Sequence, residues 1–225
     1  MTELPRIGIV SALHDELAAV LQRLPDEQRE SVAGRDFWCG HWHGHALVAV
    51  LARVGKVAAA TTATILIERF GVDRIVFTGV AGGLAADVRV GDIVLARELL
   101  QHDMDASPLF ARHEVPLYGR ARFATDAALS DALARAAQAV LAQPDATLGA
   151  AVTREFALHA ARLHQGLVVT GDRFVAAAAD SAALRTISDR ADDSAHVDFS
   201  RFVARVASPV SAAVLEAYFS SLPNE

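Results

Sequence analysis

The amino-acid sequence predicts an α/β protein, a three-layer α/β/α sandwich around a central mixed, mostly parallel β-sheet. Short apolar runs of strand length alternate along the chain with segments of helical length and spacing. Of the 225 residues, 52% are hydrophobic and 21% are charged, which is enough apolar material for a sizeable core. No stretch rich in proline, glycine or serine divides the chain, so residues 1–225 are expected to form a single domain.

The predicted elements follow one another with few interruptions. His43-Gly44-His45 separates two strand patterns and is a hairpin signal, and Gly71 ends a helix. A polar stretch with two prolines, residues 101–125, predicts a long loop over the site. In order, the predicted elements are strand 7–10, helix 15–24, strands 37–42 and 46–52, helix 57–70, strands 74–78 and 91–96, helix 126–141, strand 166–170 and helix 198–222.

Composition and charge exclude several classes of function. The net charge is −6 and the 21 lysines and arginines are scattered, so no basic surface for nucleic acid or membrane is expected. Cys39 is the only cysteine, which excludes an intrachain disulfide and a cysteine-based metal cluster. The first residues lack the pattern of a signal peptide, and no apolar stretch reaches the roughly 18 residues of a membrane span. A soluble, cytoplasmic protein is therefore expected.

Polar or glycine-rich residues follow four of the predicted strands, in segments 10–16, 78–84, 170–174 and 187–192. In open α/β sheets, ligands gather at such carboxyl ends of strands. Gly79, Gly82 and Gly83 allow the backbone to turn sharply and to approach a ligand, although an ordinary turn explains them equally well. Their spacing matches neither a dinucleotide-binding fingerprint nor a P-loop.

Three carboxylates of these segments are candidates for catalysis. Glu16, Asp172 and Asp189 each follow a predicted strand, and parallel strands would bring them to one rim of the sheet. Two carboxyl groups with different pKa values can divide the roles of general acid and general base. Each carboxylate taken alone is more often a helix cap or a surface charge, so the hypothesis depends on their joint placement.

Other kinds of site find little support. His102 and Asp103 follow a strand, but the third and fourth ligands of a metal site are missing at the required spacing, so no metal is expected. No Gly-x-Ser-x-Gly elbow occurs, which excludes the common serine hydrolases. Gly55-Lys56 lacks the upstream glycine of a P-loop and predicts a turn into a helix.

Taken together and in order, these motifs resemble the 5′-methylthioadenosine/S-adenosylhomocysteine nucleosidases of the purine nucleoside phosphorylase superfamily. The similarity covers nearly the whole chain, which would then be a single nucleoside phosphorylase-like domain. The motifs that carry it are residues 7–10 with Glu16, 54–60, 78–84, 90–94, His102-Asp103, 170–174, and 187–189 with Phe199 downstream.

The resemblance implies hydrolysis of the N-glycosidic bond of a purine nucleoside, with release of adenine and without a cofactor. Asp189 matches the general acid that, with Ser188, delivers a proton toward N7 of adenine. Glu16 matches the residue that holds the attacking water near the anomeric carbon. Protonation of the leaving base and activation of water fit the oxocarbenium-like transition state of glycoside hydrolysis.

Five further residues match substrate contacts of that family. Phe174 matches the aromatic residue that stacks on the base, and the backbone of Val175 would read the adenine edge. Val80 stands where many relatives have a serine that touches the ribose or the water, and Gly82 follows it in the same segment. Phe199 matches an aromatic residue near the ribose and the 5′ substituent.

One departure from the family is large. Between Arg185 and Ile187 the family has about thirty more residues, one strand-and-helix unit, with a Met-Glu signature whose glutamate grips the ribose hydroxyls. Met1 and Met104 are the only methionines in this chain, and no Met-Glu pair occurs. This apparent internal deletion keeps open the hypothesis of a catalytically impaired member that binds nucleosides without turning them over.

Two more expectations come from the resemblance. A phosphorylase that uses phosphate is the alternative activity, and Arg53 is the candidate for a phosphate ligand because phosphate prefers arginine. Family members usually pair as homodimers, in which a residue of the neighbour reaches the site. Helix 57–70 and loop 101–125 are the expected contact surfaces, and a small-molecule nucleoside is the expected partner.

Overall fold

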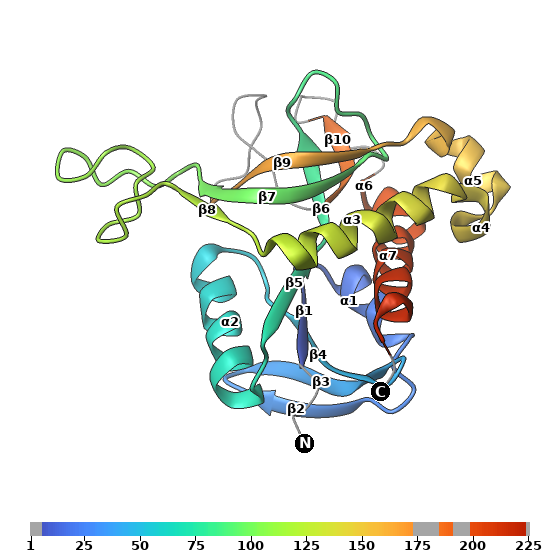
Figure 1. Ribbon diagram of the computed structural model, residues 1–225, viewed down its shortest axis with the longest axis horizontal. Helices are drawn as coiled ribbons and strands as arrows, with labels where there is room; N and C mark the ends of the chain where they lie inside the picture. The colour runs from blue at the N-terminus through green and yellow to red at the C-terminus, as the bar shows by residue number, and fades with distance from the viewer. Residues whose placement is uncertain (1–5, 173–184, 191–198, 224–225) are drawn as a thin grey trace.

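The structure, a computed structural model, describes residues 6–172, 185–190 and 199–223 (Figure 1). Its strands form two five-stranded sheets. The first has the order β2-β3-β4-β1-β5, and the second has the order β6-β10-β7-β8, with β9 also paired to β7. The strands are β1 (Ile7–Ser11), β2 (Gln28–Val32), β3 (Arg35–Trp42), β4 (His45–Leu51), β5 (Arg74–Thr78), β6 (Val80–Gly83), β7 (Ile93–Gln101), β8 (Arg122–Ala124), β9 (Leu163–Thr170) and β10 (Arg185–Arg190).

Helices cover both faces of the first sheet. Ile7 and Ile9 of β1 belong to a core shared with α1, α3 and α7, whereas Val10 belongs to a second core shared with α2. Because successive side chains of a strand point to opposite faces, β1 is buried from both sides, which confirms the layered α/β architecture (Figure 1). The helices are α1 (His14–Leu21), α2 (Lys56–Phe70), α3 (Ala127–Ala142), α4 (Pro144–Leu148), α5 (Ala150–Glu155), η1 (Leu158–Ala160), α6 (Phe199–Phe202), η2 (Val203–Ala207) and α7 (Ser208–Ser221).

One chain segment connects the two sheets. β5 ends at Thr78 and β6 begins at Val80, so only Gly79 separates a strand of the first sheet from a strand of the second (Figure 1). The pairing is mixed, as the sequence predicts. β1 runs parallel to β4 and β5, β10 to β6, and β9 to β7, while the other four pairings are antiparallel.

Tight turns join the peripheral strands. His43 and Gly44 have φ angles of 50° and 82°, which is the double left-handed conformation of a type I′ hairpin and confirms the predicted turn. Ala33 and Gly34, at 50° and 72°, make the same turn between β2 and β3. β2 is not predicted from the sequence, because its residues are mostly polar and exposed, as is typical of an edge strand.

The C-terminal helix belongs to the core. Phe199–Ser221 is long and apolar enough to cross a membrane, contrary to the expectation of only short apolar stretches, but 61% of its most apolar window is buried inside the protein. Its buried side chains Val214, Leu215 and Phe219 pack in the main core. The helix contains a π-helical segment, η2, between α6 and α7.

The predicted loop over residues 101–125 is confirmed as a long connection that ends in the short strand β8. It leaves the end of β7 and projects away from both sheets (Figure 1). The sequence predicts that this loop lies over the site, but within this one chain it does not fold back across the sheet (Figure 1).

Candidate active site

Glu16 is buried at the start of α1, with 2% of the residue exposed. Its Oε2 accepts hydrogen bonds from the backbone N–H groups of Ala12 (3.0 Å) and Leu13 (2.9 Å). Its Oε1 accepts one from the backbone N–H of Val80 (3.1 Å). Three backbone donors offset the cost of burying the carboxylate and hold it in one orientation.

Gly79 explains how the carboxylate fits between the two sheets. A Cβ atom at this position would lie 2.8 Å from Glu16 Oε1, closer than real Cβ atoms come to their neighbours. A glycine is therefore required here by close approach, and not by an unusual backbone angle. The sequence predicted that this glycine-rich segment approaches a ligand; at Gly79 the close neighbour in the structure is the Glu16 side chain.

Strand β6 connects the backbone of Asp189 with the Glu16 carboxylate. β10 runs parallel to β6, with Thr186 opposite Val80 and Asp189 opposite Gly82. Val80 binds Glu16 through its N–H, so the four-residue strand β6 contacts both the buried carboxylate and the strand of the expected acid. The two candidate catalytic residues thus share one scaffold.

The other expected site residues are only partly placed. Val80 is buried, and Phe199 begins α6 with 37% of the residue exposed. The backbone of Ser188 belongs to β10, but its side chain and that of Asp189 lie outside the described part of the structure. Phe174 and Val175 lie wholly outside the described residues.

Asp172 has partners different from those of Glu16. Its Oδ1 accepts from the backbone N–H of Lys56 (2.6 Å) at the start of α2, so this carboxylate caps a helix. Its own N–H donates to Asp103 Oδ2 (2.7 Å), and Lys56 Nζ donates to Asp103 Oδ1 (2.6 Å). The expected turn at Gly55-Lys56 is confirmed, and three motifs that are far apart in sequence meet in one network.

This network shifts the ionisation of Asp103, whose side chain is 9% exposed. Burial raises the pKa of the Asp103 carboxyl, but the hydrogen bonds from Lys56 and from the N–H of Asp172 outweigh it, so the pKa lies below its ordinary value of 3.8. Gly171 leaves room for the network, because a Cβ there would collide with His102 and Asp103. Among the described residues, no group of three or more His, Cys, Asp or Glu side chains is arranged to hold a metal.

Asp92, a carboxylate that is 1% exposed, is not among the residues that the sequence predicts for the site. It accepts hydrogen bonds from the N–H groups of Arg89 (2.9 Å) and Arg162 (2.8 Å) and is 2.8 Å from His164 Nε2. The Val90-Gly91-Asp92 motif was the available signal, but two of the three partners of Asp92, Arg162 and His164, lie about seventy residues away in sequence, and no local pattern reveals them.

Arg53, the candidate phosphate ligand, is engaged within the protein. Its Nη2 donates to the backbone carbonyl of Gly34 at 2.5 Å. Arg53 also has a positive φ of 69°, which fixes the turn before α2. This use of the guanidinium is structural.

Sequence comparison finds relatives of one kind. The 5′-methylthioadenosine/S-adenosylhomocysteine nucleosidase of Oceanobacillus iheyensis is 46% identical over 101 residues, which are 45% of this chain and 44% of the relative. The corresponding enzyme of Shewanella denitrificans is 32% identical over 170 residues, 76% of this chain and 66% of the relative. The matched stretches thus span less than two thirds of either relative.

Solved structures give the same picture over a greater length. The 5′-methylthioadenosine/S-adenosylhomocysteine nucleosidase of Neisseria meningitidis, solved with methylthio-immucillin-A, superposes with a TM-score of 0.81. The alignment covers 97% of this chain and 100% of that chain, at 27% identity. A sequence model of the phosphorylase superfamily matches residues 6–181, most of the chain. The chain therefore belongs to the phosphorylase superfamily.

Proposed function

We propose that the chain hydrolyses the N-glycosidic bond of 5′-methylthioadenosine and S-adenosylhomocysteine and releases adenine. The observation that carries the proposal is the buried Glu16 carboxylate, bound to the first residue of the same strand that pairs with Asp189. The nucleosidases among its relatives support this class of substrate.

Glu16 is suited to hold the attacking water. A carboxylate has about four acceptor positions, and backbone N–H groups occupy three of those of Glu16. The remaining position accepts an O–H of water and directs its oxygen toward the anomeric carbon. Asp189, with Ser188, protonates N7 as the bond to the base breaks. The remaining proposed contacts are Phe174 and Val175 with adenine, and Val80, Gly82 and Phe199 with the ribose and its 5′ substituent.

The test is release of adenine from 5′-methylthioadenosine by the purified full chain in phosphate-free buffer. Glu16→Gln should slow release by about a hundredfold or more, the size of a general acid–base contribution. Asp15→Asn, one residue earlier on an exposed position of the same helix turn, is the matched control and should retain activity.

Two results would contradict the proposal. Turnover that requires phosphate would identify a phosphorylase, with inorganic phosphate as the attacking nucleophile. Binding of adenine in calorimetry without turnover of any nucleoside would identify a catalytically impaired member, as the absent Met-Glu segment allows.

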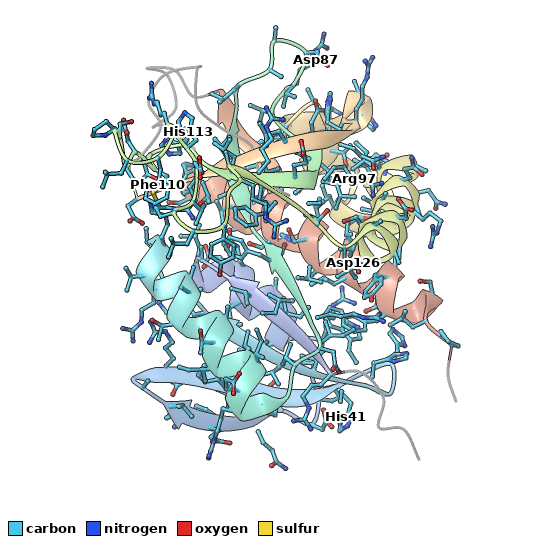
Figure 2. All side chains as sticks on the ribbon, turned by 60° about the vertical axis from the view of Figure 1, so that its left-hand side comes forward. His41, Asp87, Arg97, Phe110, His113 and Asp126 are labelled. Atoms are coloured by element: carbon cyan, nitrogen blue, oxygen red, sulfur yellow. The ribbon has the colours of Figure 1, made fainter. Side chains whose placement is uncertain are left out.

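We also propose that the chain acts as a single-domain cytoplasmic homodimer. Val57 on α2 is 79% exposed, and Leu117 on the projecting loop is 92% exposed. Large apolar side chains that are this exposed favour burial against a partner. Figure 2 shows Phe110 and His113 on this loop, above the end of α2 at which the helix begins. Light scattering should give twice the mass of 23.9 kDa, and Val57→Glu with Leu117→Glu should give the single mass. Gln138→Glu, on the exposed side of α3, is the control, and a monomeric unmodified chain would contradict the proposal.

A further inference from the structure

We propose that Asp92 is a positioning residue, which together with His164 holds strand β10 and thereby the proposed general acid, Asp189, in place. The inference rests on the proposed function for its catalytic consequence. Its structural part, the anchoring of β10 by Asp92, can be tested without any turnover.

The carboxylate of Asp92 joins three segments. Its Oδ1 accepts from the N–H of Arg162 (2.8 Å), just before β9, and its Oδ2 accepts from the N–H of Arg89 (2.9 Å), in the loop before β7. His164 on β9 brings Nε2 to 2.8 Å from the same Oδ2. With only 1% of the residue exposed, Asp92 has little access to water as a substitute partner, so these three contacts define its geometry.

The backbone at Asp92 holds β10. The carbonyl of Asp92 accepts from the N–H of Ile187 (2.8 Å), and the N–H of Gly91 donates to the carbonyl of Ile187 (2.9 Å). Both backbone groups of Ile187 are thus bound by two consecutive residues. Gly91 has a φ of 92°, and a Cβ there would collide with the side chain of Leu158, so the sharp approach needs glycine.

Ile187 also anchors β10 through its side chain. It is 2% exposed and packs in a small core cluster with Val88, Val94 and Val168. Val88 belongs to the same loop as Arg89, which binds the Asp92 carboxylate. The carboxylate and the apolar cluster therefore fix the loop and β10 together.

Strand β10 has little strand pairing on the side of β7, so its contacts with Gly91 and Asp92 matter there. β10 pairs with β7 only through Arg185 and Thr186 within the described part of the chain. The sequence before Ile187 lacks the apolar run that usually seats a buried strand. Beyond Thr186, the contacts of Ile187 with Gly91 and Asp92 therefore replace strand pairing on that side, two residues before Asp189.

A poorly held β10 should affect one step of the reaction above all. Protonation of the leaving base requires the acid at a fixed position, and a displacement of about 1 Å can lower a rate on the order of a hundredfold. Glu16 is less directly exposed to a change at Asp92. None of its three N–H donors binds Asp92, and only one of them, Val80, lies on a strand that pairs with β10. Loss of the Asp92 contacts should therefore slow protonation of the base more than activation of water.

The experiment compares two substrates in the variant Asp92→Asn. Asparagine keeps the shape but turns one donor group toward the N–H groups that the carboxylate accepts from. We expect kcat for 5′-methylthioadenosine to fall about tenfold to a hundredfold, with a smaller change in KM. For 4-nitrophenyl β-D-ribofuranoside, whose leaving group departs without protonation, we expect a change within about threefold. Equal losses on both substrates, or no loss on either, would overturn the catalytic role.

A second measurement tests the anchor itself. Hydrogen exchange of the peptide that contains residues 185–190 should become at least about tenfold faster in Asp92→Asn. The backbone carbonyl of residue 92, which accepts from the N–H of Ile187, would no longer be held in place by the side-chain contacts. Asp126→Asn is the matched control, since Asp126 is exposed and its carboxylate caps α3 through a 2.7 Å bond from the N–H of Leu129. Unchanged exchange at 185–190 would overturn the inference, even if the unmodified chain turns over no nucleoside. An inactive unmodified chain with the expected exchange would instead contradict only the proposed function.

Discussion

Replacement of Gly79 by alanine tests whether the position of the Glu16 carboxylate governs activity. The added methyl carbon would lie 2.8 Å from Oε1 and 3.2 Å from both Cδ and Oε2. An ordinary contact is at least 3.4 Å, so the carboxylate must withdraw by about 0.6 Å from the strand. Withdrawal lengthens its hydrogen bond to the N–H of Val80, which is already 3.1 Å.

The expected effect is larger on rate than on stability. Overpacking of this kind costs about 1–3 kcal/mol of unfolding free energy. A displacement that approaches 1 Å at a reacting group lowers the rate by about tenfold to a hundredfold. Adenine release from 5′-methylthioadenosine should therefore fall by that factor at a temperature where the variant remains folded.

Gly166→Ala is the matched control. Gly166 lies in β9, its φ is not positive, and a Cβ there would meet no atom within 4 Å. This variant should keep the wild-type rate and melting temperature, both of which are measured beside Gly79→Ala. If Gly79→Ala turned over nucleoside as fast as Gly166→Ala, Glu16 would not be held at a position that the reaction requires.

Three further predictions concern the polar networks. Lys56→Met should lower the unfolding free energy, measured in urea, by about 2 kcal/mol, because the buried Asp103 carboxylate loses its 2.6 Å hydrogen bond from Lys56 Nζ. An unchanged urea midpoint of unfolding would contradict this. Since the pKa of Asp103 is lower in the folded chain than its ordinary 3.8, the stabilisation is present above that value and is lost as pH falls through the lower folded pKa. Melting temperatures between about pH 5 and pH 2 should accordingly fall less steeply for Asp103→Asn than for the unmodified chain, and parallel curves would refute the assignment. Gly91→Ala should be the most destabilising of the glycine-to-alanine variants in calorimetry, because strain at a φ of 92° adds to the collision with Leu158.

The sequence predicted those parts of the fold in which apolar periodicity is strong. β1, β4, α2 and β5 are continuous apolar or amphipathic segments, and their ends were correct to within a few residues. β7 continues to Gln101, past the predicted end at residue 96, because pairing with β9 extends the strand into polar residues. Pairing with a distant strand leaves no local pattern in the sequence.

The candidate site shows the same division. Glu16 was found because it follows a strand, and the structure gives it three backbone donors. Asp172 follows a strand as well, but the N–H at the start of α2 binds its carboxylate, and α2 lies more than one hundred residues earlier. The partner of a carboxylate at a strand end depends on the packing of distant elements. The local sequence could therefore identify Glu16 and Asp172 as candidates, but it could not predict which of them binds a helix start.

The chain passes from the first sheet to the second at Gly79, and this gives Glu16 a structural role as well as a chemical one. One carboxylate oxygen is bound to the loop that leaves β1, in the first sheet, and the other to the first residue of β6, in the second. Removal of an active-site charge often stabilises an enzyme at the expense of activity. Here the same carboxylate links the two sheets through hydrogen bonds. A substitution of Glu16 should therefore lower stability and activity together, instead of exchanging one for the other.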